Sequence, residues 1–220
     1  MSQADALFIR TCREILDTGV WDTDQNVRPH WDDGTPAHTI KKFGIVNRYN
    51  LQEEFPILTL RRTYWKTAVD ELLWIWQKKS NNVHDLNAHI WDQWADETGS
   101  IGKAYGYQLG IKHVYPEGEM DQVDRVLYDL KHNPASRRIM TNLYNFQDLH
   151  EMHLYPCAYS MTFNVSGNTL NAIFEPAQPG HAGRQQLERG AVCRAGAYVC
   201  PGQRTAGRRT GPRHRRCPHL

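Results

Sequence analysis

The stretch AYSMTFNVSGNTLNAIF, residues 158–174, decides the fold because it has the pattern of a β-hairpin. Every second residue from Tyr159 to Val165 is apolar, which is the period of a strand with one buried face. Ser166-Gly167-Asn168 then supplies a tight turn, and the chain comes back. The pattern predicts two antiparallel strands in a sheet that organises the molecule.

Upstream of the hairpin, three segments carry apolar residues at helical spacing: 4–19, which ends at Gly19, 61–77 and 121–134. The second of these, RRTYWKTAVDELLWIWQ, is apolar on most of its girth, so we expect it to be buried. Helices interleaved with strands predict an α/β or α+β domain with a sheet as its central layer.

Two further segments have the character of strands. Residues 39–51, TIKKFGIVNRYNL, predict a strand pair or one bent strand, with a bulge at Gly44. Residues 136–145, SRRIMTNLYN, predict another strand directly after the third helix.

The charge distribution divides the 220 residues into two parts. Residues 1–174 carry 17 Lys and Arg against 22 Asp and Glu, a net charge of −5. Residues 175–220 carry nine Arg, no Lys and two Glu, a net charge of +7, together with seven Gly and five Pro. So sharp a break predicts a boundary, with one domain over 1–174 and a separate tail over 175–220.

Location is suggested by what the sequence lacks. No N-terminal apolar run follows a basic segment, and no run reaches 18 apolar residues, so we expect neither a signal peptide nor a membrane span. Five unevenly spaced cysteines favour a reducing compartment over a disulfide framework. The expected compartment is the cytoplasm.

Two residues stand out as candidates for chemistry. Cys157 lies directly before the hairpin, where a lone cysteine is more often a small buried apolar residue than a nucleophile. Glu71 lies within the nearly all-apolar second helix, where a carboxylate must be paired or have a raised pKa. A partnered structural acid and a proton relay poised near neutral pH explain Glu71 equally well.

Two other groups of residues have both a purely structural and a functional interpretation. Arg137 and Arg138 stand side by side before a strand, where arginines are usually solvated but also suit a phosphate. HIWDQWADETGSIGKAYGYQLG, residues 89–110, is dense in aromatic residues, among them Trp91, Trp94 and Tyr105. Core packing explains most such clusters, and stacking on a flat heterocyclic ligand is the alternative.

Together these segments resemble one family closely, the thymidylate synthases. DELLWIWQ (70–77), HIWDQWADETGSIGKAYGYQLG (89–110), NPASRRI (133–139) and YPCAYSMTFNV (155–165) occur in the family's order and at its spacings. The resemblance covers residues 4–174. It implies the family's fold, a large mixed β-sheet with flanking helices, incomplete here at the C-terminus.

The family methylates dUMP to dTMP, with 5,10-methylenetetrahydrofolate as one-carbon donor and reductant. By resemblance Cys157 is the nucleophile that adds to C6 of the uracil ring, which makes C5 nucleophilic. Glu71 matches the glutamate that manages protons around the developing enolate through ordered water. Tyr105 matches the tyrosine associated with removal of the C5 proton.

The resemblance also implies binding residues and an assembly. Trp91 and Trp94 fall where the family lines its folate-facing cavity. Arg137 and Arg138 match the pair that reaches across a homodimer to hold the dUMP phosphate of the partner subunit. No metal is implied.

The sequence departs from the family at two places before the tail. WDDGTPAHT, residues 31–39, stands where many members have an arginine-containing RTGTGT phosphate loop, which places the chain in a divergent branch. Ala158 follows the nucleophile where many members have histidine.

The tail departs from the family altogether. After Phe174 a member continues with a phosphate-binding QRS, then an aspartate, an asparagine for the uracil ring and a His-x-Tyr for the sugar. None of these occurs in residues 175–220. Glu175 to Gly180 can be encoded by GAA CCA GCG CAG CCA GGA, and the same bases read one position later encode N-Q-R-S-Q. With permitted codons, this shifted reading frame continues through the tail to a His-Ile-Tyr. The sequence therefore predicts a frameshift at Phe174 and a truncated, inactive and poorly soluble chain with a disordered tail.

Two alternatives remain open. The tail could be a genuine arginine-rich arm that contacts nucleic-acid phosphates, with Cys193, Cys200, Cys217 and His219 as unusual zinc ligands. The chain could also be a pyrimidine hydroxymethylase relative, which shares the nucleophile and differs in how the reaction finishes.

Overall fold

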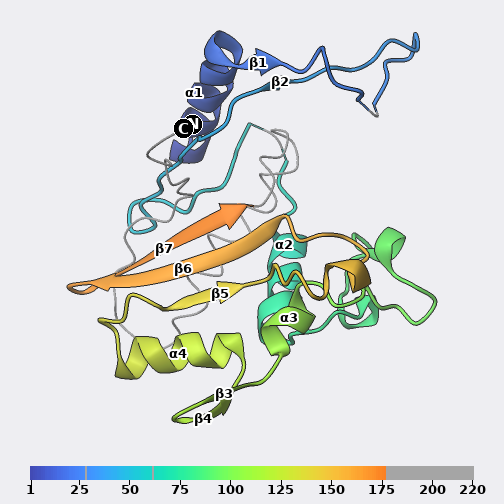
Figure 1. Ribbon diagram of the computed structural model, residues 1–220. Coiled ribbons are helices and arrows are strands. Elements are labelled where there is room, and N and C mark those ends of the chain that lie inside the picture. Colours follow the sequence, from blue (N-terminus) through green and yellow to red (C-terminus); the bar gives the residue numbers. More distant parts are fainter. Residues whose placement is uncertain (28, 61, 177–220) are drawn as a thin grey trace.

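A three-stranded antiparallel sheet lies at the centre of the molecule, in a computed structural model that describes residues 1–27, 29–60 and 62–176 (Figure 1). Its strands are β5 (Met140–Asn142), β6 (Ala158–Ser166) and β7 (Thr169–Pro176), in the order β5-β6-β7. The predicted hairpin is confirmed. β7 continues to Pro176, two residues past the boundary expected from the composition.

The register of the hairpin follows from its turn. Ser166 pairs with Thr169, and Gly167 takes a φ of 58°, a conformation that glycine adopts without steric cost. Met161 therefore faces Phe174 across the two strands. The pairing shifts at Tyr159, between Ala158 and Ser160, so the strand is irregular where it leaves the cysteine.

Two helices contribute to the core beside the sheet. α2 (Trp65–Leu72) continues directly into a π-helix, η1 (Leu73–Gln77), and α4 (Gln122–His132) runs beside β5 (Figure 1). Alternate inward residues of the strands pack on the inner faces of these helices. The buried residues of this core are Ala68, Leu72, Val126, Leu130, Ile139, Met161, Phe163, Leu170 and Ala172.

A second, more aromatic core joins the π-helix to the segment between residues 83 and 110. That segment contains η2 (Val83–Asp85), η3 (Asp92–Trp94) and α3 (Gly106–Gly110), and the loop after β5 adds η4 (Leu149–Glu151). The buried residues of this core are Trp74, Ile75, Leu86, Trp91, Ile101, Ala104, Tyr105, Leu109, Val123, Leu143 and Met152.

The N-terminal helix α1 (Gln3–Thr18) ends where its sequence predicts, and the structure shows how it begins. Ser2 Oγ accepts the Asp5 N–H at 3.1 Å, and the Asp5 carboxylate accepts the Ser2 N–H at 3.0 Å, which is a capping box. Gly19 ends the helix. Two short ribbons complete the described part: β1 (Val20–Trp21) with β2 (Ile40–Lys41), and β3 (His113–Tyr115) with β4 (Gly118–Met120).

Three expectations about these elements need correction. The strand expected over 39–51 is limited to Ile40–Lys41, and Gly44, at a φ of 82°, lies outside any strand rather than in a bulge. The helix expected from residue 61 begins at Trp65, whose side chain is 52% exposed because the first turn faces away from the core. The strand expected over 136–145 covers only Met140–Asn142.

Candidate active site

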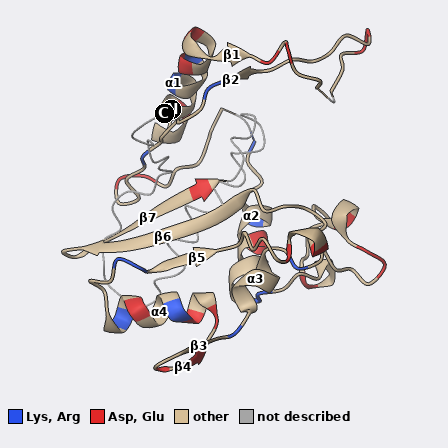
Figure 2. Ribbon diagram, viewed as in Figure 1, with Lys and Arg blue, Asp and Glu red and all other residues tan. Residues whose placement is uncertain are grey.

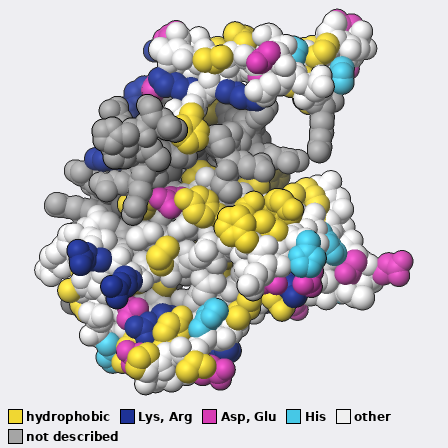
Figure 3. Space-filling view, viewed as in Figure 1, with side chains coloured by type: hydrophobic (Ala, Val, Ile, Leu, Met, Phe, Trp, Pro, Cys, Tyr) yellow, Lys and Arg dark blue, Asp and Glu magenta, His cyan; other side chains and the backbone are white. Residues whose placement is uncertain are grey.

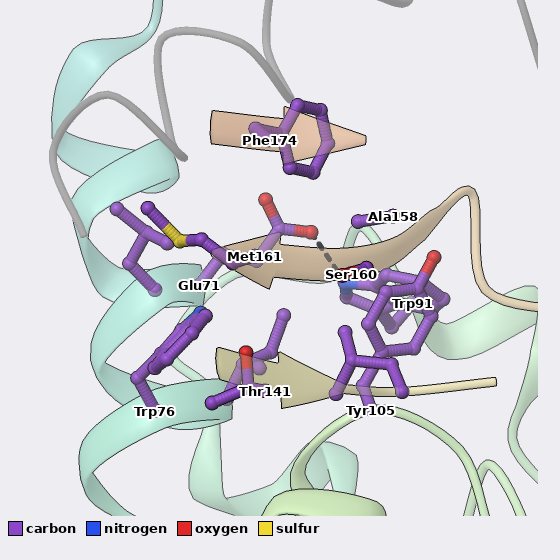
Figure 4. Close-up of a pocket in the computed structure, with 12 residues that line it drawn as sticks. Glu71, Trp76, Trp91, Tyr105, Thr141, Ala158, Ser160, Met161 and Phe174 are labelled. Carbon is purple, nitrogen blue, oxygen red and sulfur yellow. Dashed lines mark hydrogen bonds between the residues drawn. The ribbon is translucent and has the colours of Figure 1, made fainter. Parts of the chain in front are cut away.

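A cavity opens between the helical segment of residues 71–76 and the three strands (Figure 4). It contains about 630 Å³ of empty space, part of it open to solvent. Its wall combines an apolar majority with one carboxylate and a few hydroxyls, which suits a flat polar ring. The lining residues are Glu71, Leu72, Ile75, Trp76, Trp91, Tyr105, Thr141, Leu143, Ala158, Ser160, Met161 and Phe174.

Glu71 places its carboxylate at this cavity and is paired with an indole. Trp91 Nε1 donates a hydrogen bond to Glu71 Oε1 at 2.7 Å, the dashed line in Figure 4. Trp91 is itself 7% exposed and packs against Trp74 and Trp94, with ring centroids 5.9 and 5.3 Å away. The carboxylate therefore has a neutral donor from a rigid aromatic neighbour, and it faces the space that a ligand would fill.

Tyr105 connects the cavity to Cys157. The Cys157 N–H donates to the Tyr105 hydroxyl at 3.1 Å, and the Tyr105 ring meets the Trp91 ring edge-on at 5.1 Å. Cys157 is half-buried, and its neighbour Ala158 lines the cavity. Glu71, Trp91, Tyr105 and Cys157 thus form one continuous set of contacts, although they come from four separate segments.

The remaining residues singled out in the sequence lie outside the cavity wall. Trp94 is half-buried behind Trp91, and its carbonyl oxygen contacts His153 Nδ1 at 2.8 Å. Arg137 and Arg138 are exposed in the connection from α4 to β5, which Figure 2 shows in blue. Neither guanidinium forms an ion pair with a carboxylate of the described residues.

Several lining residues were not identified from the sequence. Thr141 is 1% exposed, and Ser160 is 6% exposed with a buried hydroxyl that has no hydrogen-bond partner among the described residues. The alternation of the hairpin signalled Met161 as inward-facing. No sequence signal marked Ser160, because the shifted pairing at Tyr159 breaks the alternation there.

Residues 1–176, apart from 28 and 61, hold no group of His, Cys, Asp and Glu arranged for a metal ion. None of the helices in this part is long and apolar enough to cross a bilayer. The four residues imagined as zinc ligands, and the whole arginine-rich tail from residue 177, lie outside the described residues.

Comparisons with known proteins agree with this arrangement. Residues 6–175 match the profile of the family described as thymidylate synthase. The thymidylate synthase of Bacillus subtilis subsp. natto is 48% identical over 176 residues, and that of Bacillus phage phi3T is 47% identical over the same length. Each alignment covers 78% of this chain and 63% of the relative.

The fold gives the same answer as the sequence comparison. The structure of thermostable thymidylate synthase A from Bacillus subtilis superimposes with a TM-score of 0.87 and 36% identity, covering 96% of this chain and 77% of that chain. The site and fold define a protein of mixed helix and sheet with the architecture of that structure. The chain belongs to the thymidylate synthase family. It spans about 63% of the length of the curated relatives it matches.

Proposed function

We propose that this site carries out the chemistry of thymidylate synthesis, the reductive methylation of dUMP at C5. The observation that supports it most is the meeting of Glu71, Trp91 and Tyr105 at one cavity beside Cys157. These residues are up to 86 positions apart, and core packing alone does not require a carboxylate and a phenol at one cavity beside a cysteine whose N–H donates to that phenol.

Each residue has a role that its position permits. The thiolate of Cys157 adds to C6 of the uracil ring, and the electron pair displaced from the C5–C6 bond makes C5 a nucleophile. Glu71 exchanges protons with the ring oxygen through water while Trp91 holds the carboxylate in place. Tyr105 assists in removing the C5 proton after the one-carbon unit has been attached.

A reduced folate is the co-substrate that this proposal requires, and the wall of the cavity fits it. Trp91 lines the cavity, and Trp94 packs against it from outside the wall, with ring centroids 5.3 Å apart and planes tilted by 57°. A flat pteridine ring packs well on an aromatic surface such as that of Trp91. The folate supplies the one-carbon unit and the hydride when bound. The chain's own residues orient dUMP and exclude water.

A homodimer completes the proposed site. Arg137 and Arg138 are exposed, lie outside the cavity wall and pair with no described carboxylate, so they are available to a phosphate on a neighbouring subunit. Sedimentation is expected to give a dimer. Arg137→Ala combined with Arg138→Ala is expected to weaken dUMP binding at least tenfold without changing the sedimentation coefficient.

The activity of the chain as it stands is expected to be low. The family match ends at residue 175, at the same point where the composition changes and the family's QRS and His-x-Tyr segments fail to appear. We infer that residues 175–220 are the product of a reading frame displaced by one base. Without those segments, little binding energy remains to hold C6 against the thiolate.

Tritium release from dUMP labelled at C5 tests both the proposed reaction and the low activity expected of the chain as it stands. The chain as it stands is expected to release tritium far below the rates of its family. Deleting one base at the codon for Phe174 is expected to raise the release by orders of magnitude, and Cys157→Ser in that restored protein is expected to abolish it. A restored protein that remains inactive, or a Cys157→Ser variant that remains active, would contradict the proposed function.

A further inference from the structure

Tyr105 has an unusual backbone conformation for a residue with a side chain. Its φ of 44° and ψ of −103° lie outside the usual regions, and Lys79 is the other described non-glycine residue with a positive φ. Such a conformation costs free energy and persists where the surroundings determine it, most often at functional sites. The strain has a visible result, because it directs the Tyr105 side chain towards Trp91 and Cys157.

The phenol of Tyr105 is held firmly in that direction. The residue is 6% exposed, and its ring packs edge-on against Trp91 at 5.1 Å with an interplanar angle of 65°. Gly106 follows directly, in a position where a Cβ atom would overlap the carbonyl oxygen of Ser80. The hydroxyl is therefore fixed by the backbone on one side and by aromatic packing on the other.

The partner of this hydroxyl is the main chain of the proposed nucleophile. Cys157 lies one residue before β6, so its N–H falls outside the ladder that pairs β6 with β7. That N–H donates to the Tyr105 hydroxyl, 52 residues away, at 3.1 Å. The buried amide of Gln108 adds a second link, because it donates to Asp148 at 2.9 Å in the loop that leads to Cys157.

We propose that Tyr105 is a positioning residue for Cys157, because its hydroxyl accepts the Cys157 N–H and fixes the main chain that carries the thiol. The proposal rests on the proposed function only in taking Cys157 as the nucleophile. A thiolate attacks a ring carbon along a narrow approach, and a displacement of about 1 Å costs about a hundredfold in rate. This role needs only the phenol oxygen as an acceptor, so it is separate from any removal of a substrate proton.

Hydrogen exchange of the Cys157 amide tests the contact directly, in the full chain and without substrate. Labelling with ¹⁵N-cysteine gives one amide for each of the five cysteines, and Cys157→Ser assigns the relevant signal. Tyr105→Phe keeps the ring and removes the acceptor. Exchange at Cys157 is expected to accelerate about tenfold, the ratio that 1.4 kcal/mol produces. The amide of Cys12, within α1, is expected to stay unchanged.

Tyr107→Phe is the matched control, since it removes a phenol oxygen two residues further along from a side chain that is 38% exposed. It is expected to leave exchange at Cys157 within twofold of the unaltered chain. Equal acceleration in both variants would show a general loosening of the segment and would overturn the proposal.

Alkylation by iodoacetamide supplies a readout that separates positioning from proton removal. In Tyr105→Phe the half-buried thiol of Cys157 is expected to react at least threefold faster relative to Cys12, because its main chain is released. A tyrosine that acted only on the C5 proton would leave both alkylation and exchange unchanged. That outcome would overturn the positioning role while leaving the proposed function intact.

The unaltered chain keeps the proposal testable if Tyr105→Phe does not fold. The Cys157 amide is expected to be protected at least tenfold against exchange relative to an unstructured peptide of the same sequence. An unprotected Cys157 amide in the folded chain would overturn the proposal without any variant.

Discussion

The hydrogen bond from Trp91 Nε1 to Glu71 Oε1 ties one buried indole to one carboxylate. Trp91→Phe keeps an aromatic ring in the stack but leaves that carboxylate oxygen without its donor. The carboxylate of Glu71 is half-buried, so the lost hydrogen bond and the smaller ring together are expected to lower the free energy of unfolding by about 2 kcal/mol. Urea unfolding followed by far-UV circular dichroism measures the change.

Trp94→Phe is the control for this prediction. Trp94 packs against Trp91, with ring centroids 5.3 Å apart, and it is Trp91 rather than Trp94 that donates the 2.7 Å hydrogen bond to Glu71 Oε1. Its substitution is expected to cost about 1 kcal/mol through lost contact area alone. Equal losses in the two variants would show that the hydrogen bond contributes nothing beyond packing.

At the scale of elements, α3 depends on a close approach between two backbones. A Cβ atom at Gly106 would overlap the carbonyl oxygen of Ser80, which directly follows Lys79 and its φ of 53°. Because the Ser80 carbonyl belongs to the main chain, it cannot move away without shifting the backbone. Gly106→Ala is expected to destabilise the protein by about 2–3 kcal/mol in a urea titration.

Gly110→Ala, in the same helix, provides the comparison. A Cβ atom there would lie 3.3 Å from the Lys79 Cβ, a distance that a small side-chain shift relieves. A change of less than about 1 kcal/mol is expected. Alanine favours a helix more than glycine does, so helix propensity cannot destabilise either variant. Equal losses in Gly110→Ala and Gly106→Ala would therefore contradict a special role for the contact with Ser80.

The N-terminus of α4 gives a prediction about pH. Asp121 caps this helix by accepting the Asp124 N–H at 2.9 Å, and it accepts hydrogen bonds from Lys112 at 2.8 Å and Lys79 at 2.6 Å. Burial alone would raise the pKa of Asp121, but these hydrogen bonds outweigh it and hold the pKa well below its usual value of 3.8. The folded state therefore binds its proton more weakly than the unfolded state does.

The sign of the effect on stability follows. A carboxyl whose pKa is lowered by folding stabilises the protein fully above about pH 5, and that contribution is lost as the pH falls below about 4. Asp121→Asn is expected to cost about 3 kcal/mol at pH 7, because Lys79 and Lys112 lose a buried partner, and to flatten the acid limb of stability against pH. Urea midpoints at pH 7, 5 and 3 measure both.

Asp124→Asn is the matched control, because Asp124 contacts the same two lysines with a side chain that is 44% exposed. It is expected to cost less than about 1 kcal/mol and to leave the acid limb unchanged. An unaltered acid limb in Asp121→Asn would contradict a contribution of Asp121 to that limb.

The elements also show what the sequence can and cannot predict. The hairpin was predictable because apolar alternation and a Gly-containing turn are local signals. The helices α1 and α4 were predictable from the helical spacing of their apolar residues and, for α1, from Gly19 at its end. The Tyr105 conformation was not, because nothing in Ala-Tyr-Gly-Tyr distinguishes an ordinary turn from a strained one. The contact between Glu71 and Trp91 joins residues 20 positions apart, so the sequence could not show it. The sequence therefore left Glu71 open as a partnered structural acid or a proton relay, and the structure adds that Glu71 has a hydrogen-bond partner.

At the scale of the whole molecule, the break in composition and family resemblance at residue 175 can be tested on the gene. Sequencing the codons for residues 172–176 is expected to find an extra base in a run of T, with a family-like reading in the displaced frame downstream. Finding no such frame would reject the frameshift. An arginine-rich tail that binds RNA with salt-dependent affinity, from an undisplaced gene, would favour the nucleic-acid interpretation instead.

The order β5-β6-β7 has a consequence for the behaviour of the chain in solution. Within the part of the chain that the structure describes, β7 pairs only with β6, on one of its two sides. Figure 3 shows hydrophobic side chains gathered across the middle of the molecule. A strand edge that is left unpaired is a template for a strand from another molecule. Because such pairing joins two molecules, we expect protein concentration, more than temperature, to determine how soon the chain aggregates.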